Sequence, residues 1–190
     1  LKFEGKTILL SGGSGFLGKY FVLVFTYLND NVFEKPCKLI SVDNYMVGSD
    51  HPHFTTRGRE DVLQVWADVS LPLPVREDVH FILHAAGVAS PVYYKKYPLE
   101  TIEGAVSGIK NLLELARKNS ELEGFIFFSS SEIYGDPDPS AVPTPETYHG
   151  YVSSVGPRAC YDESKRLSET IATIYNEQFG IPTKIVRPFN

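Results

Sequence analysis

The stretch Thr7-Ile-Leu-Leu-Ser-Gly-Gly-Ser-Gly-Phe-Leu-Gly18 decides the fold, because a short apolar run passes directly into a glycine-rich turn. A helical pattern then runs from Phe16 to Leu28. Without side chains, such a turn can be tight, and its N–H groups can approach a pyrophosphate closely. A turn without any ligand is the alternative, but the place between a strand and a helix favours dinucleotide binding. The residues expected to contact the cofactor here are Gly12, Gly15, Phe16, Leu17 and Gly18.

Short apolar runs alternate with helical patterns along the rest of the chain. Continuous apolar strands separated by helices are typical of a parallel sheet that is covered on both faces. The sequence therefore predicts an α/β fold with a doubly wound parallel sheet of the Rossmann type, as one domain over residues 1–190. Strands are expected at 7–11, 38–43, 62–66, 79–84, 125–129 and 183–187, and helices at 16–28, about 98–118 and about 158–179.

Four prolines between Pro137 and Pro145 interrupt this alternation. Proline lacks an N–H donor and clashes within a helix, so this stretch is neither helix nor central strand. We expect a loop between the strand that ends near Ser129 and the helix that carries Tyr161.

Composition excludes several classes of partner. The 190 residues are 43% hydrophobic and 22% charged, with a net charge of −5. No basic stripe suggests nucleic acid, and no apolar run approaches the roughly 18 residues that span a membrane. Cys37 and Cys160 form neither a CxxC motif nor a His/Cys cluster, so neither a metal site nor a disulfide framework is expected. A reducing, cytoplasmic location is the expectation.

The two ends of the chain indicate a piece of a longer protein. The sequence lacks an initial Met and enters its first strand without a signal peptide. It stops at Arg187-Pro-Phe-Asn190, directly after a strand. We expect an N-terminal portion whose substrate-binding part is largely absent.

Acidic residues follow two of the strands. Asp43 ends the second strand, where a carboxylate can accept both ribose hydroxyls of an adenosine and repel a 2′-phosphate, which favours NAD over NADP. Arg57 and Arg59 could offset that repulsion or simply face solvent. Asp68 and Val69 follow the third strand and could contact adenine, with a turn-capping role for Asp68 as the alternative.

The fourth strand ends in Leu83-His-Ala-Ala-Gly87, which places small residues where the backbone would pass a cofactor. Leu83, Ala85 and Ala86 are therefore cofactor candidates. His84 is expected to be packed rather than catalytic.

Tyr161 and Lys165 have the spacing of neighbours on one helix face. The ammonium can lower the pKa of the phenol, and such a phenol can remove a hydroxyl proton while a nicotinamide takes the hydride. The same spacing occurs by chance on exposed helices, so this pair is a hypothesis that needs its context.

Together these residues resemble the extended short-chain dehydrogenase/reductase superfamily of NAD-dependent epimerases and dehydratases. The matching segments run in the family's order: the glycine turn, Asp43-Asn44, Asp68-Val69, 129–137, 156–165 and 187–190. Within the superfamily, Ser129 to Arg166 is most similar to the UDP-glucuronate decarboxylases, also called UDP-xylose synthases. The resemblance implies NAD as cofactor, with Asn44 in its site, and a UDP-sugar as substrate.

The resemblance also implies roles for individual residues. Tyr161 is the base for the sugar 4-hydroxyl, and Lys165 lowers its pKa and holds the nicotinamide ribose. Ser130 stands where the family has a catalytic Thr or Ser that bonds the same oxygen. Ser131 and Asn190 correspond to substrate-contacting positions.

Ser131 and Glu132 bear on the choice of reaction. The dTDP-glucose 4,6-dehydratases have Asp-Glu here, and Ser131 cannot replace that acid near neutral pH. GDP-mannose 4,6-dehydratases nevertheless resemble Thr-Ser-Glu and still dehydrate. Plain 4-epimerases usually lack the Glu, so Glu132 is a catalytic candidate, with a capping or solvated carboxylate as the alternative.

Two departures from the family pattern concern the substrate more than the cofactor. Ala105 stands where the family commonly has Asn, and Ala cannot make that side-chain hydrogen bond. The loop between Glu132 and Tyr161 is about two residues longer than in the decarboxylases.

The function expected from the resemblance is C4 oxidation and decarboxylation of UDP-glucuronate to UDP-xylose, with internal recycling of NAD. A 4,6-dehydratase or 4-epimerase is the alternative, and a non-catalytic NAD-binding module is the alternative of another class. Family members usually form homodimers through the helices at 98–118 and 158–179. Ile109, Leu112, Leu113 and Ala116 fit such a contact, but they fit packing on the sheet equally well.

Overall fold

Six parallel strands form one sheet in the computed structural model, which describes residues 1–47 and 56–189. The strand order is β3-β2-β1-β4-β5-β6, and every neighbouring pair is parallel. This arrangement confirms the predicted doubly wound α/β fold. The strands are β1 (Thr7–Ser11), β2 (Lys38–Asp43), β3 (Val62–Trp66), β4 (Phe81–His84), β5 (Gly124–Phe128) and β6 (Thr183–Val186).

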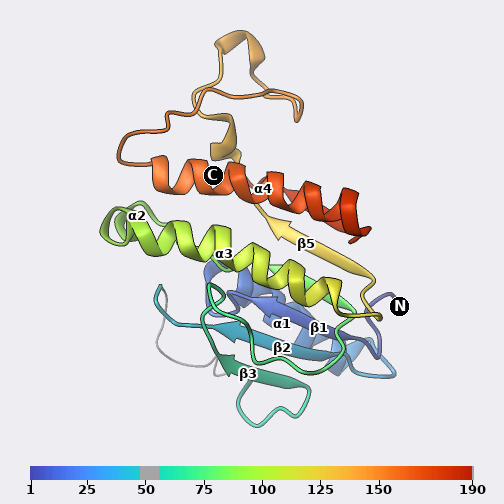
Figure 1. Cartoon of the computed structure of the whole chain (residues 1–190). Coiled ribbons are helices and arrows are strands. Elements are labelled where there is room, and N and C mark those ends of the chain that lie inside the picture. Colours follow the sequence, from blue (N-terminus) through green and yellow to red (C-terminus); the bar gives the residue numbers. More distant parts are fainter. Residues whose placement is uncertain (48–55, 190) are drawn as a thin grey trace.

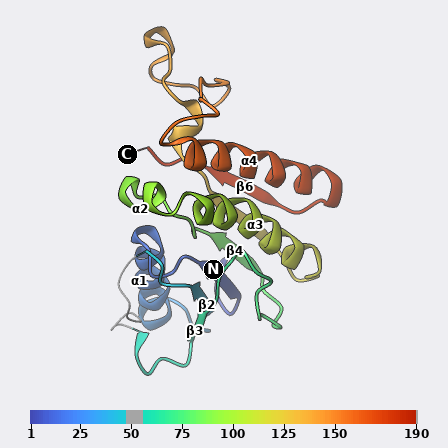
Figure 2. The same cartoon turned by 60° about the vertical axis from the view of Figure 1, so that its left-hand side comes forward.

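Helices cover both faces of the sheet. Helix α1 (Phe16–Asn31) lies on one face, and α3 (Pro98–Arg117) and α4 (Ala159–Phe179) lie side by side on the other (Figures 1 and 2). A short helix, α2 (Pro91–Lys96), precedes α3, and the 3₁₀ turns η2 (Ser131–Tyr134) and η3 (Pro139–Ala141) follow β5. No helix in the described ranges has the length and apolar content needed to cross a bilayer.

Alternating side chains of the strands divide the core into two layers. On β1, Ile8 and Leu10 pack in the layer under α1, together with Val22 and Phe25. Leu9 points to the opposite face and packs in the layer under α3 and α4. Because successive side chains of a strand point to opposite faces, one apolar strand supplies both layers.

The apolar residues of α3 belong to this second layer. Ile109, Leu112, Leu113 and Ala116 are buried in it. Packing on the sheet therefore accounts for these four residues, and they do not form an exposed dimer surface. The same helical spacing would serve a dimer contact or packing on the sheet, so only the burial of these side chains distinguishes the two roles.

The proline-rich segment projects from the body of the domain as a long loop, in gold and orange at the top of Figure 1. It contains the single 3₁₀ turn η3, which the sequence does not predict; Pro139 begins this turn, where a missing N–H is tolerated. Arg166 on α4 binds the base of the loop by donating hydrogen bonds to the Ile133 and His149 carbonyls, at 2.7 and 2.9 Å.

Candidate functional site

The strand order reverses direction between β1 and β4. In open parallel sheets, ligands bind in the crevice beyond the carboxyl ends of the strands at such a switch point. A cavity lies there, formed by the ends of β1, β2, β3 and β4 and by the start of α3. Its walls include Gly12, Gly15, Asp43, Asn44, Asp68, Val69, Ala85, Ala86, Gly87, Glu100 and Glu103.

The glycine turn is packed so closely that side chains have no room. Gly12 has a φ of +77°, and a Cβ there would lie 2.6 Å from the backbone N of Ala86. A Cβ on Gly18 would lie 2.0 Å from the Gly12 carbonyl oxygen. The turn therefore presents bare backbone to the cavity, as a close approach to pyrophosphate requires.

Asp43 is fixed at the cavity wall by two backbone donors. Its Oδ2 accepts a hydrogen bond from the Ser14 N–H at 2.9 Å, and its Oδ1 accepts one from the Tyr45 N–H at 2.8 Å. Each carboxylate oxygen has further lone pairs, which can accept ribose hydroxyls.

Asp68 is held similarly at the neighbouring strand end. Its Oδ1 accepts from the Ser70 N–H at 2.8 Å, and its Oδ2 accepts from the Asn44 side chain at 3.0 Å. Burial acts to raise the pKa of Asp68, but these hydrogen bonds outweigh it and lower the pKa. Asp68 thus caps a local turn and lines the cavity at once, so the two roles predicted from the sequence are compatible.

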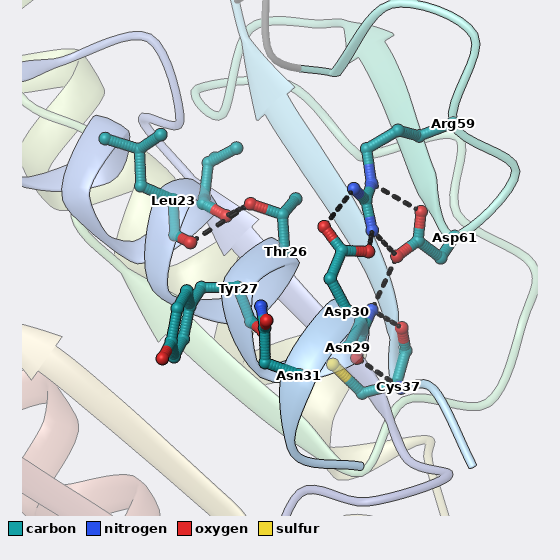
Figure 3. A network of polar contacts seen from close by, with 10 residues as sticks. Leu23, Thr26, Tyr27, Asn29, Asp30, Asn31, Cys37, Arg59 and Asp61 are labelled. Atoms are coloured by element: carbon teal, nitrogen blue, oxygen red, sulfur yellow. Dashed lines mark hydrogen bonds and ion pairs between the residues drawn. The ribbon is translucent and has the colours of Figure 1, made fainter. Parts of the chain in front are cut away.

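The cavity wall is acidic. Four carboxylates line it, and among its described residues there is no lysine or arginine. Arg59 instead lies near the far end of α1, where it forms hydrogen bonds to Asp30 and Asp61 (Figure 3). The residues present fit the two ribose hydroxyls of NAD and disfavour an additional 2′-phosphate.

The structure brings most, but not all, of the expected cofactor residues to this cavity. Gly12, Gly15, Asp43, Asn44, Asp68, Val69, Ala85 and Ala86 line it. Gly18 lies behind the turn, and the side chains of Phe16 and Leu17 are exposed on α1. Leu83 is buried in the core layer under α1, because side chains alternate along β4 and its own points away from the cavity.

Lys165 lies on α4 with Tyr161, and both side chains are buried. The Lys165 Nζ donates a hydrogen bond to the Phe128 carbonyl oxygen at 2.7 Å and lies 5.9 Å from the centroid of the Tyr161 ring. Burial lowers the pKa of Lys165 to about 8. The predicted pairing on one helix face is thus present.

The predicted effect on the phenol differs. Burial raises the pKa of Tyr161, a hydrogen bond with Ser130 opposes that rise, and the nearby Glu132 and Asp162 carboxylates add to it. The expectation that Lys165 lowers the pKa of Tyr161 below its usual value is therefore wrong, because burial of the phenol is the largest influence and raises that pKa.

Ser130 lies at the end of β5 and begins η2. Its Oγ accepts a hydrogen bond from the Glu132 N–H at 3.3 Å. The Ser129 and Ser131 N–H groups donate to the Val186 and Pro188 carbonyls, at 2.8 and 2.9 Å. The segment that places the Ser130 hydroxyl beside Tyr161 is therefore held by the last strand.

Glu132 forms an ion pair with Arg158, and the Arg158 Nε lies 3.4 Å from an Asp162 carboxylate oxygen. The alternative that Glu132 only caps a turn or faces solvent is therefore incomplete, because its carboxylate pairs with Arg158 at the start of α4. Sequence reasoning does not single out Arg158. It stands three residues before Tyr161, one helical turn away, and that spacing was the available signal.

Tyr94 is a second residue that sequence reasoning missed. It is buried on α2, and its ring stacks on that of Tyr161, with centroids 5.4 Å apart and planes 13° from parallel. The six-residue α2 is too short to show a helical periodicity, so only the two adjacent tyrosines, Tyr93 and Tyr94, could have drawn attention to it.

His84 is packed, as expected. Its Nδ1 lies 2.8 Å from the Ser11 Oγ, its ring stacks on Phe127, and burial lowers its pKa to about 3. Ala105 is also buried, and its carbonyl accepts a hydrogen bond from the Ser168 hydroxyl at 3.2 Å. Asn190 lies outside the described residues. Within the described ranges, no group of three or more His, Cys, Asp or Glu side chains is placed to hold a metal ion.

Known proteins share this fold and much of the sequence. Over 184 residues, the chain is 39% identical to UDP-glucuronic acid decarboxylase 5 of Arabidopsis thaliana, covering 96% of the chain and 50% of that protein. It is 35% identical to UDP-glucuronic acid decarboxylase 1 of Xenopus tropicalis, covering 98% and 41%. The chain thus spans half or less of these relatives' lengths.

A solved structure of similar fold is dTDP-glucose 4,6-dehydratase from Streptomyces venezuelae, with NAD and TYD bound. It superposes with a TM-score of 0.76 at 23% identity, over 95% of this chain and 55% of that one. The model of the NAD-dependent epimerase/dehydratase family matches residues 8–190, and NAD, the cofactor expected from Asp43, is the cofactor of that family. The chain belongs to the NAD-dependent epimerase/dehydratase family.

Proposed function

We propose that the protein converts UDP-glucuronate to UDP-xylose and carbon dioxide, by oxidation at C4, decarboxylation and internal recycling of NAD. The observation that carries the proposal is the 35% and 39% identity to UDP-glucuronic acid decarboxylases along nearly the whole chain. Tyr161 and Lys165 do not line the acidic cavity but lie next to its wall, and this placement supports the proposal. Tyr161 packs in one cluster with Val88 of the wall, and a Cβ on Gly87 of the wall would lie 3.6 Å from the Lys165 Nζ.

When bound, NAD supplies a hydride acceptor at its nicotinamide ring and returns the hydride at the end of the cycle. Tyr161 removes the proton of the 4-hydroxyl, and Ser130 forms a hydrogen bond to the same oxygen. The resulting ketone is β to the sugar carboxylate, so the bond to that carboxylate breaks with its electron pair delocalised into the ketone. Loss of carbon dioxide leaves an enolate, which takes up a proton at C5. The 4-ketone then regains the hydride at C4 while Tyr161 returns the proton to the 4-oxygen, so that UDP-xylose and NAD are formed.

Lys165 is held in place for this reaction by the Phe128 carbonyl. With a pKa of about 8, its amine is mostly protonated at neutral pH. The ammonium lies 5.9 Å from the centroid of the Tyr161 ring, where it can donate a hydrogen bond to the nicotinamide ribose of bound NAD. Burial remains the largest cause of the raised pKa of Tyr161.

Glu132 and Ser131 limit the alternatives. The Glu132 carboxylate is engaged in an ion pair with Arg158, which suits it to orient a substrate rather than to take the place of the dehydratases' acid. Ser131 supplies no acid either. A 4,6-dehydratase that protonates a departing hydroxyl therefore has less support than a decarboxylase.

The test is turnover by the full-length protein with UDP-glucuronate, followed by release of carbon dioxide and formation of UDP-xylose. Tyr161→Phe should lower the rate by about 10²–10⁴-fold while NAD binding persists. A 4-keto-6-deoxy product from a nucleotide hexose would instead assign a dehydratase, and inversion at C4 an epimerase. NAD binding without turnover of any nucleotide sugar would identify the protein as a non-catalytic NAD-binding module.

A further inference from the structure

Helix α1 has a second apolar face, opposite the one that packs on the sheet. Its sheet side carries the buried residues Gly18, Val22, Phe25 and Thr26. On the other side, large apolar residues reach solvent: Phe16, Tyr20, Leu23, Val24 and Tyr27 are 77%, 58%, 42%, 51% and 63% exposed. We call these five residues the outer α1 face. A helix that is apolar all round is normally buried on all sides.

The spacing on this face is that of a helix-packing seam. Phe16, Tyr20, Leu23 and Tyr27 follow one another at intervals of four, three and four residues, as in the seam of a coiled coil. The Phe16 and Tyr20 rings already pack edge to face, with centroids 5.5 Å apart. The seam is therefore partly ordered before any partner binds.

The exposed apolar area of the outer α1 face is at the upper end of what the surface of a monomer usually shows. Aromatic side chains present roughly 150–250 Å² each, so the three rings alone expose on the order of 400 Å². Leu23 and Val24 bring the patch to the upper end of the roughly 300–600 Å² that the largest patch on a monomer usually reaches. Patches of this size commonly mark interaction sites.

A polar rim with fixed geometry borders the outer α1 face (Figure 3). Arg59 forms two hydrogen bonds to Asp30, at 2.9 and 2.8 Å, and two to Asp61, at 2.9 and 2.7 Å. A groove lies between this rim and the helix and is lined mainly by apolar side chains, Tyr20, Leu23 and Tyr27 among them. The two carboxylates more than neutralise the charge of Arg59, so the rim offers no unpaired cation for an anionic ligand.

We propose that the outer α1 face binds the same face of a second copy of this chain, with the two helices antiparallel about a two-fold axis. The 4-3-4 spacing is the same in both directions along the helix, which is the self-complementarity that such an interface requires. Phe16 then meets Tyr27 of the second copy, and Tyr20 meets its Leu23. Two such faces together bury on the order of 1,000 Å², the lower limit of a specific interface.

This contact is separate from the family's dimer helices, α3 and α4, which lie on the other side of the sheet (Figure 2). It does not depend on the proposed reaction. Leu23 is placed in neither the catalytic nor the cofactor machinery, so its substitution tests the contact alone.

The experiment is sedimentation equilibrium of the full-length protein carrying Leu23→Glu. Leu71→Glu is the matched control, because Leu71 is also an exposed leucine but lies after β3, away from α1. We expect Leu23→Glu to halve the assembly mass or to weaken association by at least tenfold, and Leu71→Glu to leave both unchanged. Circular dichroism should show the same helix content in both variants. An unchanged assembly in Leu23→Glu overturns the proposal.

A second variant tests the geometry. In the antiparallel pair, Leu23 faces Tyr20 of the second copy, so the double variant Tyr20→Cys/Leu23→Cys should form an intermolecular disulfide under mild oxidation, and Leu71→Cys should not. Introduced thiols that form no disulfide and react freely with maleimide would show an uncovered face, whatever the assembly through α3 and α4. Introduced thiols that form no disulfide and are protected from maleimide would show that another segment of the same protein covers α1. Either result overturns the proposal.

Discussion

A buried ammonium is the residue-scale feature with the clearest energetic consequence. Lys165 is almost fully buried and makes one hydrogen bond that the structure records, to the Phe128 carbonyl. Burial lowers the pKa of Lys165 from 10.5 to about 8, so at neutral pH the folded state holds a charge that it disfavours. The group belongs to the proposed chemistry, and stability is lower because of it.

We expect Lys165→Met to raise the free energy of unfolding at pH 7 by about 2 kcal/mol, because release of the desolvation penalty exceeds the lost hydrogen bond. Turnover should be lost. The unfolded chain keeps this proton up to pH 10.5, whereas the folded chain releases it near pH 8. The stability of the wild type should therefore rise relative to Lys165→Met between these two pH values. Urea unfolding across this range measures both effects, and a destabilised variant at pH 7 contradicts the first.

Glu132 acts on the phenol through space. Burial is the largest cause of the raised pKa of Tyr161, and the Glu132 carboxylate adds to the rise. Glu132→Gln removes that charge and should lower the pKa of Tyr161. The chain has 11 tyrosines, so the ultraviolet phenolate titration needs subtraction of the same titration in Tyr161→Phe. If the pKa of Tyr161 is unchanged or higher in Glu132→Gln, the Glu132 carboxylate does not contribute to the raised pKa of Tyr161.

The positions of Tyr161 and Lys165, the proposed catalytic pair, could be predicted from sequence, but the pKa direction of Tyr161 could not. The four-residue spacing places Lys165 beside Tyr161 on any helix. The pKa direction of Tyr161 depends instead on how far α2 and η2 exclude water, which no local pattern records. Arg158 escaped notice for a related reason, because its partner Glu132 comes from a different element.

At the scale of elements, the turn between β1 and α1 tolerates no added atom at Gly18. We expect Gly18→Ala to weaken NAD binding by at least tenfold and to destabilise the fold by about 1–3 kcal/mol, because the new Cβ overlaps the Gly12 carbonyl. Calorimetric titration with NAD and thermal unfolding measure the two effects.

Gly104→Ala is the comparison for stability. Gly104 lies within α3, and a Cβ there meets nothing within 4 Å. This change should stabilise the protein by about 0.5–1 kcal/mol, since alanine restricts the unfolded chain and favours helix. Equal effects of the two substitutions would contradict the role assigned to the turn.

Elements with a clear hydrophobic periodicity could be predicted from sequence, whereas the short elements α2, η2 and η3 could not. All six strands and the three long helices lie where the apolar patterns place them, and no end differs from its predicted position by more than three residues. The six-residue α2 and the turns η2 and η3 are set by contacts with α4 and the proline loop rather than by a repeat of their own. Those short elements carry Tyr94 and Glu132, so the incompletely predicted part of the fold is also part of the site.

At the scale of the whole molecule, the acidic cavity should bind NAD more tightly than NADP, which carries an additional 2′-phosphate. Asp43, Asp68, Glu100 and Glu103 line the cavity. NAD at 100 times its Kd should add about 2.7 kcal/mol to the free energy of unfolding. NADP at the same concentration should add much less to the free energy of unfolding. Asp43→Asn should make the stabilisation by NAD and by NADP more nearly equal. Thermal shift measurements decide this, and equal stabilisation by both cofactors would contradict it.

The last strand also ties together segments that are far apart in sequence. Arg187, directly after β6, binds Glu169 on α4 through two hydrogen bonds, and it donates to the Tyr134 hydroxyl and the Glu146 carbonyl. The residues beside it hold the backbone of Ser129 and Ser131. During synthesis on the ribosome, β1 to β5 emerge first and can pair without β6. The hydroxyl of Ser130 cannot be fixed against Tyr161 until residues 186–188 have emerged, so these two side chains are brought together only after all six strands have been translated.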